Sequence, residues 1–330
     1  MRTYTKLRND TAGFCNVSTS DTVAMAKIDS NINDSIRTIC NLQGGKLRFL
    51  EATKDMSTVA SQESYQIPNG FRKLIDLQIY SESTASSTAT IYTPEMVFDP
   101  TKWKLVQQYR YGSSDVPYFT YVENQKYYIQ PIPSTTGNLI RLRGRLQTRD
   151  LSIADYTTGT IVSIANGGTA VVGSGTTWTE DMVGRYIKIT ETTPANGGDG
   201  FWYQIGSYTS ATSIGLLKPY EGTSISAGSA AYTIGQTSVI PAAYDIGIVY
   251  RATALFWQNV PDLERAKTYW TQYDGGNEAG YTDSYGGIIG QMLANEGETE
   301  EGSYVPPFGS TSNLPNVPYY FPYQDASGFN

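Results

Sequence analysis

Residues 160–172, TIVSIANGGTAVV, decide how this chain folds. Two runs rich in β-branched residues, 160–164 and 169–172, flank the turn Asn166-Gly167-Gly168. An Asn-Gly pair between two such runs is the strongest short-range signal for a β-hairpin. Short apolar runs alternate with glycine, serine and threonine as far as residue 235. We therefore predict that residues 157–235 form an inserted all-β domain, built as a sandwich or a barrel.

The segments on either side of this insertion carry helical patterns. Residues 20–42 predict an amphipathic helix, because apolar residues recur there at spacings of three and four. These residues are Met25, Ile28, Ile32, Ile36 and Ile39. Ser20 or Asp21 can cap the start of the helix, and Gly44-Gly45 ends it.

Further helices are predicted after the insertion. Residues 241–259 predict a well-buried helix with Pro241 in its first turn. A second helix starts at Pro261 and stops at Gly275-Gly276, and residues 284–295 predict a third.

Residues 64–150 alternate in the manner of strands. Ile75, Leu77 and Ile79 are predicted to share one strand face. Residues 118–122 and 127–130 predict a hairpin, and residues 139–146 another strand. Asp99 and Pro100 predict the cap and first residue of a short helix.

The expected fold class is therefore α+β. It combines a helical bundle core with β-strands, the inserted all-β domain and an extended C-terminal arm. The predicted units are 1–156 (N-terminal helix and β-rich part of the core), 157–235 (the insertion), 236–299 (C-terminal helices of the core) and 300–330 (the arm).

Composition argues against a protein that grips nucleic acid. The net charge of the 330 residues is −7, whereas a nucleic-acid-binding chain shows a basic footprint. A passage through which DNA slides can still be acidic, because phosphate-binding groups would retard the DNA. The longest apolar runs fall short of the ~18 residues that a membrane span needs. We expect a soluble protein, made in a cytoplasm and free of membrane contact.

The residues available for catalysis are few. The chain has no histidine and two cysteines, Cys15 and Cys40, which removes the common triads and zinc sites. We expect both thiols to be reduced, with Cys40 in the core. Glu180, Asp181 and Asp199 are the candidate catalytic carboxylates, but such residues after a strand are typical of turns. We predict no enzyme, no metal and no cofactor.

Arg141, Arg143 and Arg145 alternate, so they share one face of a strand, and Arg149 follows nearby. They could contact DNA phosphates or an acidic surface of a partner subunit, or form a solvated strand face. In a homo-oligomer, the acidic residues of segment 296–301 are one complement for them.

The C-terminal segment combines prolines with aromatic residues, which favours an extended arm that docks on a partner. Its candidate anchors are Tyr304, Phe308, Tyr319, Tyr320, Phe321 and Tyr323. The alternative is a tail that packs back onto its own domain.

The order of these motifs resembles the head-to-tail adaptor (connector, or neck) proteins of tailed bacteriophages. The resemblance rests on GTTWTEDMVGRYIKI, GDGFWYQIGSY, LLKPYEG and YTIGQTSVIPAAYDIGIVYRATALFWQ, and on the helical N-terminal segment. It implies a virion protein assembled in the host cytoplasm as a ring of identical copies, twelvefold in this family. The ring would lie between the portal and the tail or nozzle proteins, with the arm reaching to the portal. DNA would pass through its lumen without sequence recognition.

Two other classes of function remain open. Trp178, Phe201, Trp202 and Tyr203 could serve as stacking platforms of a carbohydrate- or receptor-binding virion protein, of the fibre or decoration type. The carboxylates named above could serve a glycan-cleaving enzyme. Core packing explains the same aromatic residues more simply.

Overall fold

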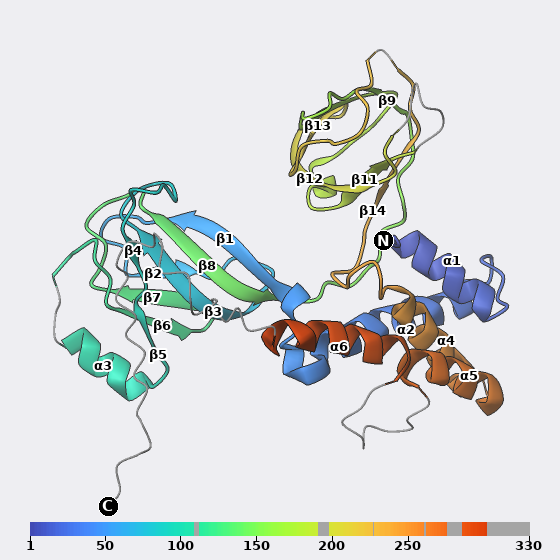
Figure 1. Ribbon diagram of the computed structural model, residues 1–330, viewed down its shortest axis with the longest axis horizontal. Coiled ribbons are helices and arrows are strands. Elements are labelled where there is room, and N and C mark those ends of the chain that lie inside the picture. The colour runs from blue at the N-terminus through green and yellow to red at the C-terminus, as the bar shows by residue number, and fades with distance from the viewer. Residues whose placement is uncertain (109–111, 191–197, 227, 261, 276–285, 302–330) are drawn as a thin grey trace, which may run out of the picture.

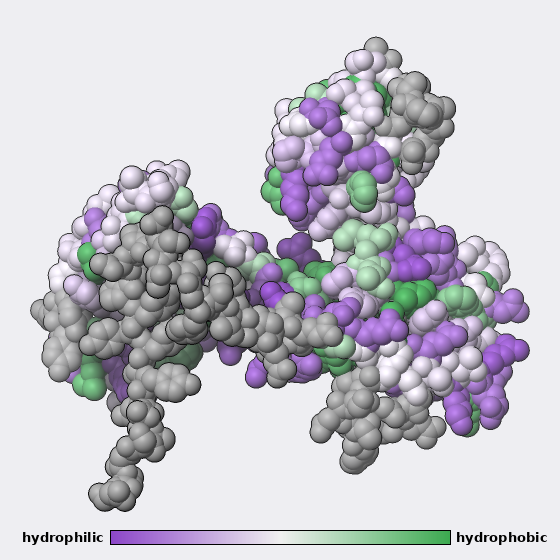
Figure 2. Space-filling model, in the orientation of Figure 1, coloured by the Kyte–Doolittle hydropathy of each residue, from purple (hydrophilic) through white to green (hydrophobic). Residues whose placement is uncertain are grey.

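The computed structural model describes residues 1–108, 112–190, 198–226, 228–260, 262–275 and 286–301, with residues 297–301 as backbone only. Over these residues the chain forms six α-helices and fourteen strands in three sheets, a mixed α+β fold. Figure 1 shows three groups of elements: a set of helices, a lobe of strands coloured blue to green, and a curved sheet beyond the helices. Hydrophilic residues cover much of the described surface of the helices and of the curved sheet in Figure 2.

Five helices share one hydrophobic cluster. They are α1 (Tyr4–Phe14), α2 (Thr22–Asn41), α4 (Ile246–Asn259), α5 (Leu263–Asp274) and α6 (Gly287–Glu301). The apolar face predicted for α2 is confirmed, because each of its five members, from Met25 to Ile39, is at most 1% exposed. Asp21 caps α2 by accepting hydrogen bonds from the backbone N–H groups of Val23 and Ala24. Helix α4 is buried around much of its circumference, as predicted.

The helices differ from the prediction at α1, α4, α5 and α6. Helix α5 begins at Leu263, with Asp262 as its N-cap, and not at Pro261. Helix α1 was not expected, because threonine and asparagine interrupt its weak apolar pattern. Helix α4 begins at Ile246 and not at Pro241, because the chain first makes a turn in which Tyr244 N–H donates to the Pro241 carbonyl. Helix α6 runs on to Glu301, beyond its expected end. Gly275 ends α5 in the left-handed conformation (φ +86°), as its position predicts.

The lobe follows two 3₁₀ turns, η1 (Leu42–Gly45) and η2 (Arg48–Leu50), and contains two four-stranded sheets. The first has the order β1 (Glu51–Ser57), β8 (Leu139–Leu146), β3 (Phe71–Tyr80) and β4 (Ile91–Tyr92). The second has the order β2 (Ser64–Gln66), β7 (Lys126–Gln130), β6 (Phe119–Glu123) and β5 (Glu95–Val97). Helix α3 (Pro100–Gln108) packs on β6 through the buried Trp103.

Most local predictions for the lobe are confirmed. Strands β6 and β7 form the expected hairpin, and Asp99 caps α3 by accepting from the Thr101 N–H. The face predicted for β3 is partly wrong. A bulge between Leu74 and Asp76 shifts the alternation, so Leu74 is buried with Leu77 and Ile79, whereas Ile75 is only half-buried.

The curved sheet is a six-stranded half-barrel with the order β14-β11-β12-β13-β10-β9. Its strands are β9 (Thr160–Ser163), β10 (Ala170–Ser174), β11 (Tyr186–Ile189), β12 (Trp202–Ser210), β13 (Ser213–Leu216) and β14 (Tyr232–Gly235), with the 3₁₀ turn η3 (Glu180–Met182) between β10 and β11. Strands β9 and β10 pair across the Asn-Gly turn, as predicted. Single bridges join Ile161 to Ala230 and Ile164 to Ile225. They connect the β9 edge of the sheet to the segment that precedes β14, the strand at the opposite edge.

The half-barrel is joined to the helices where the chain enters and leaves it. Tyr156 and Ile234 exchange two backbone hydrogen bonds of 2.8 Å at this point. The N-terminal segment lies beside the same joint, because Tyr4 N–H donates to the Gln236 carbonyl and the Thr3 hydroxyl to Asp155. Among the described helices, none combines the length and apolar character needed to cross a bilayer.

Candidate functional site

The predicted arginine row (Arg141, Arg143 and Arg145) lies on one face of β8, a central strand of its sheet. Strand β1 places Asp55 opposite Arg141, and Glu51 opposite Arg145. Arg141 donates to both carboxylate oxygens of Asp55, each over 2.9 Å. Arg143 donates to Glu51, and Arg145 Nη2 lies 3.9 Å from the Oε1 atom of the same residue.

These contacts match positive with negative charge across the face. The hydrogen bond from Arg141 holds the pKa of Asp55 below its usual range. The Arg141 guanidinium also lies over the Tyr80 ring, 5.3 Å from its centroid. The charge of the arginine row is therefore compensated in part within its own chain, because Asp55 and Glu51 supply two carboxylates for three guanidinium groups. Exposed pairs of this kind contribute only about 0–1 kcal/mol to stability.

Arg149 does not join the arginine row. It follows the end of β8 as an exposed residue, and its Nη2 atom approaches Gly70 at the start of β3. The acidic segment 296–301, a predicted complement for these arginines in a homo-oligomer, starts at the C-terminal part of α6. Glu296 of α6 accepts a hydrogen bond of 2.6 Å from the Arg48 backbone N–H.

The four aromatic residues considered as stacking platforms do not form one surface. Trp178 is 1% exposed, and its indole N–H donates to the Tyr232 hydroxyl over 2.9 Å. Tyr203 is also buried, in the same cluster. Phe201 is 69% exposed, whereas Trp202 is half-buried beneath the Lys188 ammonium, which lies 6.0 Å from its ring centroid. Two of the four thus belong to the core of the half-barrel.

Of the three candidate carboxylates, Asp199 has a structural role in its own loop. Asp199 accepts from the Phe201 N–H over 3.0 Å and from the Tyr203 hydroxyl, which fixes the loop before β12. Burial, aided by the bond to Asp199, raises the pKa of Tyr203 to about 12. Glu180 and Asp181 are exposed on η3.

Within the part of the chain that the structure describes, acidic and cysteine side chains gather nowhere in a group that could hold a metal. Cys15 and Cys40 are buried free thiols, and burial raises the pKa of each to about 12. The position of Cys40 in the core is confirmed. The proposed anchors of the C-terminal arm, from Tyr304 to Tyr323, lie outside the described residues.

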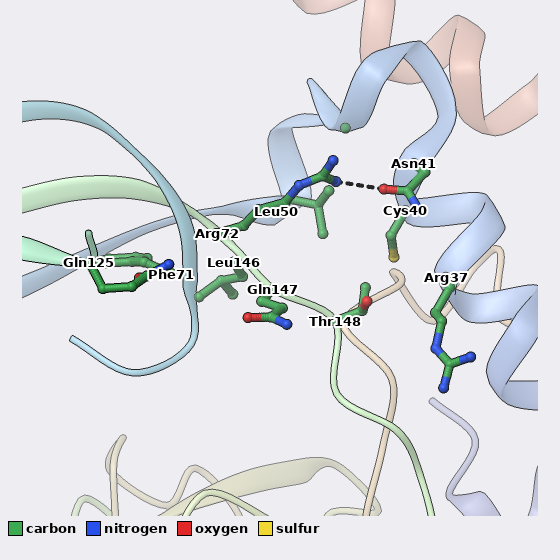
Figure 3. A pocket seen from close by; sticks show the side chains of 11 residues that line it. Arg37, Cys40, Asn41, Leu50, Phe71, Arg72, Gln125, Leu146, Gln147 and Thr148 are labelled. Atoms are coloured by element: carbon green, nitrogen blue, oxygen red, sulfur yellow. Dashed lines mark hydrogen bonds between the residues drawn. The ribbon is translucent and has the colours of Figure 1, made fainter. Parts of the chain in front are cut away.

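The structure also contains a pocket that sequence reasoning missed. It lies where the end of α2 meets β3 and the end of β8, and has a volume of about 330 Å³. Arg37 and Arg72 line it from opposite elements, with Gln147 and Thr148 between them (Figure 3). No local pattern predicts this meeting, because the two arginines stand on a helix and on a strand that are distant in sequence.

One comparison with known proteins identifies a family. The family model described as SU10 adaptor protein matches residues 2–167, which is half of the chain. The chain belongs to the SU10 adaptor protein family. The matched residues run from α1 through the lobe to the Asn-Gly turn of the half-barrel. They include the helical N-terminal segment, whereas the other motifs that suggested an adaptor lie beyond them. The search of curated proteins found no match.

Membership of the family assigns the chain to a general class. This adaptor is a phage structural protein, a component of the virion that associates with other phage structural proteins. A structural adaptor is consistent with the prediction that the chain is not an enzyme.

Proposed function

We propose that this protein is the head-to-tail adaptor of a tailed phage. Identical copies, twelve in the resembling proteins, form a ring between the portal and the tail or nozzle proteins, and DNA passes through its lumen. The observation that carries the proposal is the adaptor family match over residues 2–167. Neighbouring copies make heterologous contacts, which close into a ring when the rotation between them allows it.

In this proposal the ring core is a helical bundle, and the units follow the predicted boundaries 1–156, 157–235, 236–299 and 300–330. The single cluster shared by five helices supports a common core. The half-barrel has a separate cluster of its own, centred on Trp178 and Tyr220, which supports its treatment as an inserted domain.

The C-terminal arm is proposed to dock on the portal through Tyr304, Phe308, Tyr319, Tyr320, Phe321 and Tyr323. Such an arm pays its ordering entropy on binding, and prolines reduce that cost. The bond from Arg48 to Glu296 supports this role, because it ties α6 to the turn η2 shortly before the arm begins.

The arginine row, with Arg149, is proposed to contribute to contacts between neighbouring copies. Its pairing with Asp55 and Glu51 supports a subunit contact over a DNA contact, because paired guanidinium groups have less charge to offer to phosphates.

Native mass spectrometry of the chain, alone and with the portal of the same particle, tests the adaptor proposal. We expect a multi-copy ring on the portal. We also expect deletion of the arm, residues 300–330, to abolish portal docking while leaving the circular dichroism spectrum of the remaining chain intact. A full chain that never associates with the portal contradicts the proposal, and undiminished docking after the deletion contradicts the role of the arm.

A further inference from the structure

The pocket at the end of α2 has the lining of an anion site. Its lining residues include six with side-chain hydrogen-bond donors: Arg37, Asn41, Arg72, Gln125, Gln147 and Thr148. No aspartate or glutamate is among the described residues that line it, but Asp150 accepts two hydrogen bonds from the Arg37 guanidinium, over 3.1 and 2.5 Å. Because Asp150 already pairs with Arg37, the site depends on Arg72 together with the amide and hydroxyl donors, and this set favours a negatively charged occupant.

A hydrogen bond holds the Arg72 side chain at the C-terminal end of α2. Its Nη1 atom donates to the Asn41 side-chain oxygen over 2.5 Å, which leaves its other N–H donors for a ligand. Gly45 makes room for this arrangement. A Cβ at Gly45 would lie 3.0 Å from Arg72 Nη1, and the backbone there has φ +73°. The local backbone thus admits the guanidinium at a place where most side chains would obstruct it.

Three further basic residues are adjacent in sequence to residues that line the pocket, in a chain whose net charge is −7. Lys46 is next to Gly45, Lys73 is next to Arg72, and Arg149 follows directly after Thr148. Among the described residues, none of these three, and not Arg72 itself, has a carboxylate oxygen within 4.0 Å. This contrasts with the arginine row, whose members are paired.

We propose that this pocket binds the oxyanion of a phosphate group, either as free phosphate or as part of a nucleic-acid backbone. A guanidinium fork matches phosphate oxygens two at a time, and amide and hydroxyl donors complete such a shell. A volume of about 330 Å³ accommodates a phosphate with an attached sugar or its hydration. The free-phosphate form is independent of the proposed ring, whereas the backbone form rests on the proposed passage of DNA.

Titration with inorganic phosphate, followed by calorimetry, tests the site in the full chain. We expect saturable binding that weakens roughly tenfold or more in Arg72→Gln, because hydrogen bonds to a charged group are lost. Arg141→Gln is the matched control, since Arg141 is a strand arginine paired with Asp55 away from the pocket. Gln147→Leu alters an exposed lining residue and covers the case in which Arg72→Gln fails to fold. Absence of saturable binding, or equal affinities in the pocket variants and the control, overturns the proposal.

A second titration, with a short DNA duplex at low salt, distinguishes the two sources of phosphate. Competition between DNA and inorganic phosphate, with a salt slope reduced by about 0.9 per lost contact in Arg72→Gln, assigns the backbone form. If the protein binds inorganic phosphate but not DNA, the ligand of the pocket is free phosphate. Portal docking measured on the same variants keeps this result separate from the adaptor proposal. If Arg72 only joins α2 to the lobe, its substitution lowers the melting temperature and leaves phosphate affinity unchanged, which also refutes the site.

Discussion

Replacing Gly173 with alanine should destabilise the half-barrel, because the added methyl group would clash with Trp178 and with Thr176. Gly173 is buried in β10, and a Cβ there would lie 2.7 Å from the Cη2 atom of Trp178 and 2.7 Å from Cγ2 of Thr176. Both distances are shorter than real Cβ contacts allow. Trp178 cannot easily yield, because it is 1% exposed and its indole N–H is bonded to Tyr232. Overpacking of this kind costs about 1–3 kcal/mol.

A second substitution separates the clash from other causes. Trp178→Phe removes the Cη2 atom and should cost roughly 2 kcal/mol alone, since it loses buried area and the bond to Tyr232. In the double variant the shorter ring removes the clash with Cη2, whereas the clash with Thr176 remains. We therefore expect the double variant to be more stable than the sum of the single changes predicts, by about 1 kcal/mol or more.

Hydrogen exchange of peptides from residues 160–235, measured over a urea series, is the appropriate assay. Unfolding of a chain with several cores need not be two-state, so a local measurement is required. Gly13→Ala is the control, because a Cβ at this exposed position of α1 meets nothing within 4 Å. It should stabilise the helix by about 0.5–1 kcal/mol. Strict additivity of the two half-barrel changes would refute the assigned clash.

Three further predictions concern the helices, the lobe and the thiols. Ile32→Ala on α2, at a side chain that is 0% exposed, should cost about 2–5 kcal/mol, measurable as a fall in the urea midpoint of the helical peptides. Arg141 lowers the pKa of Asp55, so this pair stabilises the fold above about pH 4 and loses its effect as pH falls through the lower folded-state pKa. Because the Asp55 side chain is 45% exposed, the difference in stability between wild type and Asp55→Asn at pH 7 should stay below about 1 kcal/mol and vanish once the pH lies well below the folded-state pKa of Asp55. Burial and a pKa of about 12 should protect Cys15 and Cys40 from a thiol reagent at pH 8 until urea unfolds the chain; immediate reaction of the native protein would contradict this.

The parts of the fold that sequence predicts are those fixed by neighbours along the chain. The apolar face of α2 and the hairpin around Asn166-Gly167 depend on spacing and turn chemistry within a few residues. The bulge of β3 could not be predicted in this way, because it arises from pairing with β8, far along the chain. Helix α1 has too few apolar residues to be predicted from their spacing. It is stabilised by burial of Leu7 in a core to which other segments contribute.

The candidate sites follow the same division. The alternation of Arg141, Arg143 and Arg145 correctly placed them on one strand face. Their carboxylate partners were missed because only the register between β1 and β8 brings them opposite one another. The junction pocket depends on the end of α2 meeting the start of β3, a tertiary contact that no short motif encodes.

The paired backbone of Tyr156 and Ile234 makes the half-barrel a cassette. Because the chain leaves and returns at adjacent points, the sequence between them can lengthen, shrink or be exchanged while the ends presented to the helices keep their spacing. Evolution could therefore change the sequence and surface of the half-barrel without changing the helices to which it is joined. An engineer could use the same two residues as the boundaries for grafting a different domain onto the particle.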